Sequence, residues 1–176
     1  MHAELKKIAP MLRSTIDELA QPVEEILLTH VDKDRENLPN GRKLINSSCY
    51  LFGIQISHAD VSITKDEVAL IQEIDYLIDN EHISISLDSY SGIISGSVND
   101  APENYSEIMV PYPIIAATEY DSINGTNLTE KAKLLFWRLA NAIVKSDGKV
   151  SPDEKVLLKE IKEIIFSYEQ QEIQEN

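Results

Sequence analysis

Two short acidic segments carry the side chains best suited to chemistry or recognition in this sequence. Residues 60–67 read Asp-Val-Ser-Ile-Thr-Lys-Asp-Glu, and residues 147–154 read Asp-Gly-Lys-Val-Ser-Pro-Asp-Glu. Carboxylate oxygens are hard ligands that suit divalent cations such as Ca²⁺. They also complement basic protein surfaces. The candidate residues are the carboxylates that stand at matching places in the two segments: Asp60, Asp66 and Glu67, and Asp147, Asp153 and Glu154.

The second segment resembles the last eight positions of an EF-hand calcium loop, with Asp at loop position five, Gly at six and Glu at twelve. Loop positions one and three would then be Ile143 and Lys145, or Ile56 and His58 in the first segment. These side chains cannot supply hard oxygen ligands, so a high-affinity EF-hand is excluded. A weak or shared divalent-cation site stays open, and its ligands would be Asp60, Glu67, Asp147 and Glu154.

Helix capping is the competing interpretation of the same residues. Ser151 can accept a hydrogen bond from the first turn of a helix, Pro152 suits the first helical position, and Glu154 completes a capping box. Thr64 and Glu67 repeat the box in the first segment. Capping does not explain Asp60 and Asp147, which lie near a preceding helix C-terminus, where the helix dipole disfavours negative charge.

The two segments belong to an internal repeat. Residues 45–78 align with residues 132–165 at a constant offset of 87 positions, without a gap, and the apolar positions coincide. Self-similarity of this kind indicates a duplicated supersecondary unit. We therefore expect two helix-loop-helix units in a pseudo-two-fold packing, with the acidic loops at comparable ends.

The remaining pattern predicts an all-α fold of about seven helices in a single domain over residues 1–176, with repeat one at about 40–80 and repeat two at about 127–168. Apolar residues at helical spacing predict helices over about 3–20, 42–59, 65–80, 113–123, 128–146 and 152–170. Pro22 is expected to open a separate helix toward residue 38. Residues 81–111 read as an irregular connector.

Composition restricts the partners. The chain has 16 basic and 30 acidic side chains, a net charge of −14 and one cysteine, Cys49. This charge opposes binding to nucleic acid and to anionic membranes. A single thiol excludes an internal disulfide and fits a reducing cytoplasm. No apolar run is long enough to insert into a membrane. Of the adjacent Phe136 and Trp137, one should be core, and Trp137 is the candidate for a partner surface.

The region from Ser146 to Glu154, preceded by an amphipathic helix, resembles the tellurite-resistance TerB-like superfamily. Its motif is Ser-Asp-Gly-Lys-Val-Ser-Pro-Asp-Glu, with a weaker echo from Ala59 to Glu67, where Val61 replaces the family glycine. The stretch from Asn124 to Glu154 also resembles TerB-like domains fused to bacterial AAA-type ATPases.

The resemblance implies a non-enzymatic, cytoplasmic interaction module in a bacterial stress-response or membrane-associated complex. A divalent cation on the acidic loops is the one cofactor that it implies. The alternative is a substrate- or adaptor-binding domain that belongs to, or works with, an AAA-type ATPase. A phosphate-binding loop, a nucleophile elbow and a Cys-x-x-Cys pair are all missing, so we do not expect an enzyme.

Overall fold

The computed structural model describes residues 3–31, 40–57, 69, 73–74, 110–145 and 150–168. These residues form five helices: α1 (Ala3–His30), α2 (Gly41–Ser57), α5 (Tyr112–Asn124), α6 (Leu128–Val144) and α7 (Pro152–Ser167). Within the described ranges the secondary structure is entirely helical, so the prediction of an all-α bundle is confirmed. The acidic segment 60–67, most of the predicted helix 65–80 and the connector 81–109 lie outside the described residues.

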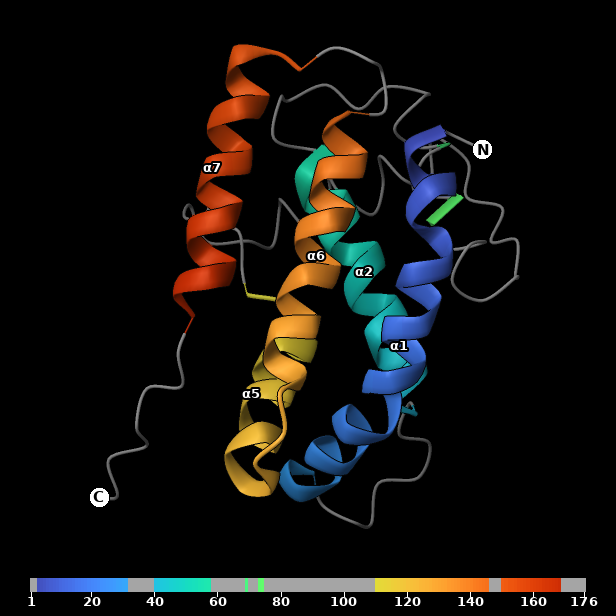
Figure 1. The fold of residues 1–176 in the computed structure, drawn as a ribbon, viewed down its shortest axis with the longest axis vertical. Helices are drawn as coiled ribbons and strands as arrows, with labels where there is room; N and C mark the ends of the chain where they lie inside the picture. The colour runs from blue at the N-terminus through green and yellow to red at the C-terminus, as the bar shows by residue number, and fades with distance from the viewer. Residues whose placement is uncertain are drawn as a thin grey trace.

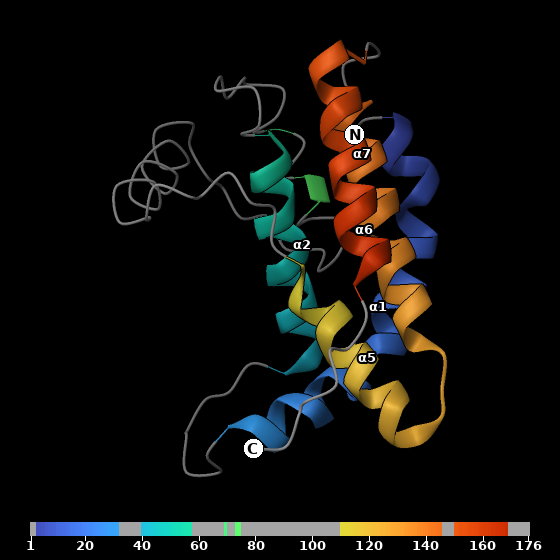
Figure 2. The same ribbon diagram turned by 90° about the vertical axis from the view of Figure 1, so that its left-hand side faces the viewer.

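The helices pack in two layers. Figure 1 shows α6 between α7 and α1, and Figure 2 shows these three helices on one side of the bundle with α2 on the other. The α5–α6 turn lies at one end of the bundle. The C-terminal ends of α2 and α6 and the start of α7 lie at the opposite end (Figure 1). Helices α2 and α6 therefore run parallel, and their C-termini point the same way.

The core lies between the two layers. Phe52 of α2 and Phe136 of α6 meet edge to face, with ring centroids 5.2 Å apart and planes at 83°. Aliphatic side chains surround this pair, which suits a chain with only 6% aromatic residues. Each fully buried Leu or Ile contributes about 1.5–3 kcal/mol relative to an exposed position. The almost fully buried Leu and Ile side chains of the described residues include Leu5, Ile16, Leu19, Ile45, Ile74, Ile114 and Leu135.

Helix α1 corrects the predicted division at Pro22. It is continuous over 28 residues, with both Pro10 and Pro22 inside it. Pro22 cannot donate to the Glu18 carbonyl, so the helix is expected to bend at this point. The last part of α1 does turn away from the first in Figures 1 and 2. Pro22 and Val23 are buried in the core, and this burial offsets the missing hydrogen bond.

Helix α2 begins in close contact with α1. The Gly41 N–H donates to Glu24 Oε2 of α1 at 3.0 Å, and the Lys43 N–H donates to Asn40 Oδ1 at 2.9 Å. Asn40 is thus a side-chain N-cap, as expected for this residue type. Arg42 forms an ion pair with Asp17 of α1. The start of α2 is therefore held by its own cap and by two carboxylates of α1.

The offset of 87 positions that relates the two sequence segments also relates α2 and α6. Each helix has 17 residues, and their first and last residues stand 87 positions apart. The burial pattern follows the same offset. The pairs of buried residues are Ile45 and Ala132, Asn46 and Lys133, Cys49 and Phe136, Phe52 and Leu139, and Ile56 and Ile143, followed by Ile74 and Ile161.

Candidate functional site

The structure describes three of the seven residues proposed from the sequence as metal ligands or interaction residues. They are Trp137 on α6 and Asp153 and Glu154 in the first turn of α7. The other four, Asp60, Asp66, Glu67 and Asp147, lie outside the described residues, as does Gly148. Their roles remain predictions from the sequence.

Glu154 forms the predicted capping box. The Ser151 N–H donates to Glu154 Oε2 at 2.6 Å, and the Glu154 N–H donates to Ser151 Oγ at 3.1 Å. Pro152 follows as the first helical residue, where its missing N–H costs nothing. One carboxylate oxygen of Glu154 is therefore engaged by its own backbone. A metal role for this residue would have to use its other oxygen or displace the cap.

Trp137 is half-buried in the packing between α6 and α7, whereas the adjacent Phe136 is completely buried. The Trp137 ring lies edge to face with Phe166 of α7, with centroids 6.3 Å apart. The ammonium of Lys162 lies 5.9 Å from the Trp137 ring centroid, within range of a cation–π interaction. The expectation that one of the two aromatic residues is core is confirmed for Phe136. Trp137 joins two helices and retains an exposed edge.

The ends of α2 and α6 precede the two acidic segments in the sequence. Both helices end at the same end of the molecule (Figure 1). In the sequence, the first segment begins three positions after Ser57 and the second begins three positions after Val144. Val150 packs against the core just before α7 begins. The two helix ends that precede the acidic segments in the sequence, Ser57 and Val144, therefore lie at the same end of the bundle.

No group of three or more His, Cys, Asp or Glu side chains within the described ranges has an arrangement that could hold a metal ion. His30, which precedes an acidic run, instead contacts Glu119 of α5, with Nε2 and Oε2 2.8 Å apart. Cys49 is 1% exposed, and burial raises the pKa of its thiol to about 12. A thiol with this pKa is neutral at pH 7 and has little nucleophilic character. Cys49 is therefore a packing residue.

Asp121 is the most heavily hydrogen-bonded carboxylate in the described part of the chain, and sequence reasoning missed it. Its Oδ1 accepts from the Thr126 hydroxyl at 2.5 Å and from the Leu128 N–H at 2.8 Å. Its Oδ2 accepts from the Thr129 N–H at 2.7 Å and from the Thr129 hydroxyl at 2.6 Å. Burial alone would raise the pKa of Asp121, but these four donors outweigh it and hold the pKa below its ordinary value.

The hydrogen bonds of Asp121 join the end of α5 to the start of α6. Gly125 allows the sharp turn between the two helices, because its φ of +66° lies in the left-handed region. Asp121 thereby caps a helix that begins seven residues later. Thr126 and Thr129 flank the predicted helix start at residue 128, and these two residues were the available sequence signal for the hydrogen bonds of Asp121. Its role is structural, since all four donors belong to the chain itself.

The chain matches no protein-family model, no curated protein sequence and no solved structure. No helix of the described residues combines the length and apolarity needed to cross a membrane.

Proposed function

We infer that this chain is a non-enzymatic interaction module of the TerB-like kind, which uses its two acidic segments together at one end of the bundle. The observation that carries this proposal is the parallel course of α2 and α6. The two helices have the same length and the same pattern of buried residues, with matched residues 87 positions apart. Their C-termini lie at the same end of the bundle, and in the sequence an acidic segment follows each of them. Two matched segments at one end can present carboxylates to a single partner.

The expected partner is a protein with a basic surface, or one bridged through a divalent cation. Asp60 and Asp147 are the residues that helix capping does not explain. Glu154 forms a cap, and the sequence match predicts a corresponding cap for Glu67. Recognition is therefore assigned chiefly to the two aspartates, with Asp66 and Asp153 beside the caps. The corresponding biological setting is a bacterial stress-response or membrane-associated complex in the cytoplasm.

Site-specific photo-crosslinking tests where the partner binds. A photo-reactive residue replaces exposed Pro152, within the second acidic segment, or exposed Ser122, near the α5–α6 turn at the other end of the bundle. We expect crosslinks from position 152, their loss in Asp60→Asn/Asp147→Asn, and none from position 122. Crosslinks that survive the double substitution, or that arise equally from both positions, would contradict the proposal. A captured AAA-type ATPase would favour the adaptor alternative.

Calorimetry addresses the divalent cation. One or two carboxylates per segment should bind Ca²⁺ only weakly, with a Kd of about 10⁻⁴ M or higher. Titrations of chelator-treated protein with Ca²⁺, Mg²⁺, Mn²⁺ and Zn²⁺ measure this directly. Submicromolar Ca²⁺ binding that Asp147→Asn abolishes would show that a complete calcium site exists.

A further inference from the structure

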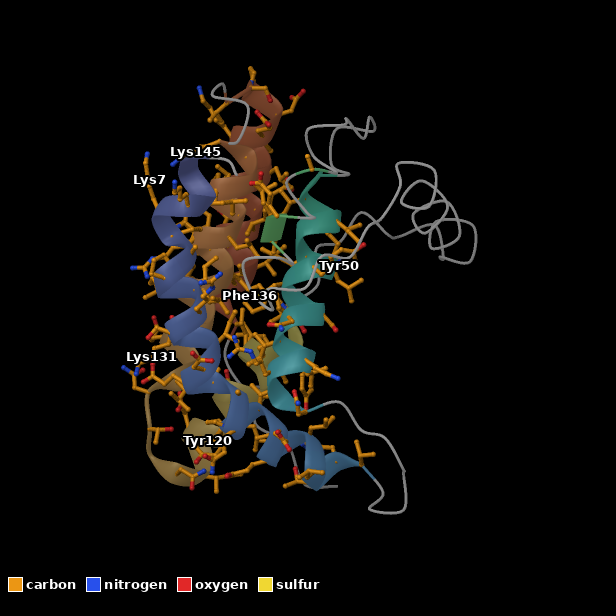
Figure 3. All side chains as sticks on the ribbon, turned by 90° about the vertical axis from the view of Figure 1, so that its right-hand side faces the viewer. Lys7, Tyr50, Tyr120, Lys131, Phe136 and Lys145 are labelled. Atoms are coloured by element: carbon orange, nitrogen blue, oxygen red, sulfur yellow. The ribbon has the colours of Figure 1, made fainter. Side chains whose placement is uncertain are left out.

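Cationic side chains lie along one side of α6, although the chain as a whole is strongly acidic and the exposed Glu130 lies on a neighbouring side of this helix. Lys131, Arg138 and Lys145 are exposed at i, i+7 and i+14, so they share one side of the helix. Lys131 pairs with Glu18 of α1, and Arg138 contacts Met11 of α1. Figure 3 shows Lys131 and Lys145 along one edge of the molecule, together with Lys7 of α1.

Helix α7 extends this cationic surface. Lys155, Lys159 and Lys162 are exposed at i, i+4 and i+7, and therefore share one edge of α7. The contact between Lys162 and Trp137 shows that this edge is the one next to α6. Lys159 Nζ lies 3.7 Å from Glu163 Oε1. Both side chains are exposed, so Glu163 offsets the charge of Lys159 only in part. The exposed acids Asp153 and Glu160 lie on a different edge of α7, and Glu163 is the exposed acid beside the lysine edge.

Apolar side chains lie between the two rows of cations. Leu134 is 37% exposed on the solvent face of α6. Trp137 and Phe166 are half-buried where α6 meets α7. Large apolar side chains flanked by cations are typical of a surface that receives an amphipathic segment of opposite charge. The surface formed by Lys131, Leu134, Trp137, Arg138, Lys145, Lys155, Lys159 and Lys162 is termed the cationic face.

The charge of the rest of the chain selects among anionic partners. The chain carries 30 acidic side chains, which repel a long polyanion or an extended anionic membrane. A short helix that stays on the cationic face experiences mainly the charges within about 8 Å, the Debye length at physiological ionic strength. We propose that the cationic face binds an acidic amphipathic helix of a partner protein, with its carboxylates on Arg138, Lys145 and Lys155 and its apolar side chains on Leu134 and Trp137.

Fluorescence anisotropy with a defined probe tests this assignment. The probe is a synthetic helical peptide with glutamates at i, i+4 and i+7 and leucines on the adjoining side. The full-length chain should bind it, and high salt should weaken binding. Arg138→Glu and Lys155→Glu should each weaken binding about tenfold, because each puts a carboxylate where the peptide places its own. Leu134→Ala should weaken binding without changing its salt dependence.

Lys43→Glu is the matched control, since Lys43 is exposed on α2 in the opposite layer and the change in net charge is the same. Binding should be nearly unchanged in this variant. Thermal melts of all variants separate loss of binding from loss of folding. Arg138 contacts α1, so Arg138→Glu can disturb the packing of α1 on α6, whereas Lys155 lies on α7 and is a second, independent test. Three results would overturn the proposal. They are a loss of peptide affinity in Lys43→Glu equal to that in the face variants, a lack of peptide binding to the wild type, and tighter binding of single-stranded RNA or phosphatidylserine vesicles than of the peptide. The acidic segments are unchanged in every variant, so failure here leaves the crosslinking test of the proposed function intact.

Discussion

Gly41→Ala should destabilise the fold strongly, because α1 leaves no room for a side chain at this position. A Cβ on Gly41 would lie 1.8 Å from the carbonyl oxygen of Ala20 and 2.9 Å from the Glu24 nitrogen. Normal contacts require at least 3.0 Å, so the two backbones must separate by about 1 Å. Overpacking of this kind costs about 1–3 kcal/mol or more. The same shift strains the hydrogen bond from Gly41 to Glu24.

The expected total is about 2–4 kcal/mol, which corresponds to a fall in Tm of roughly 5–15 °C for a chain of this size. Thermal and urea unfolding, followed by circular dichroism, measure it. Lys43→Ala, an exposed change in the same helical turn, is the control and should stay within about 0.5 kcal/mol. Since the obstacle is main-chain oxygen, Ala20→Gly should not rescue Gly41→Ala. A Gly41→Ala protein with the stability of the wild type would refute the close approach of α1 and α2.

Three further substitutions test the caps and the core. Asp121→Asn should cost about 1–2 kcal/mol at pH 7 by urea unfolding. Because the folded-state pKa of Asp121 is lowered, its contribution is fully present above the unfolded-state pKa and is lost as pH falls through the folded-state pKa. A stability difference that does not shrink as the pH is lowered would contradict this. Ser151→Ala should cost about 1 kcal/mol in the same assay, and no change would show that the capping box is dispensable. Asn46→Leu should raise stability by about 1 kcal/mol or more, since both amide atoms of Asn46 are buried without a hydrogen-bond partner among the described residues, and a lower Tm would indicate a partner.

Local signals predicted the second half of the bundle well. The apolar period predicted a helix over 128–146, and α6 spans Leu128–Val144. Ser151, Pro152 and Glu154 predicted the start of α7, because a capping box acts within one helical turn and needs no distant partner. The predicted helix over about 113–123 likewise agrees with α5, which spans Tyr112–Asn124 and ends at Gly125 in a left-handed conformation.

Features that depend on contacts between residues far apart in the sequence could not be predicted from local patterns. Pro22 favours a helix break, but burial of Pro22 and Val23 against the core keeps α1 continuous. Gly41 reads as an ordinary turn residue, and its contact with Ala20 depends on how α1 and α2 cross. The spacing of Lys155, Lys159 and Lys162 was visible in the sequence. Its alignment with the cations of α6 needed the packing of Trp137 against Phe166.

The repeat also explains where polar groups enter the core. Asn46 and Lys133 are the two buried polar residues among those described, each 6% exposed, and they occupy the same position in α2 and α6. Lys133 has a long apolar stem, and its ammonium reaches to 3.4 Å from Glu130 Oε1, an exposed carboxylate one turn earlier. The Asn46 side chain is too short to reach the surface, and its amide has no hydrogen-bond partner among the described residues, so its burial carries a desolvation cost. One helical position thus tolerates a polar residue in both copies, but the length of the side chain decides whether its polar atoms find a partner.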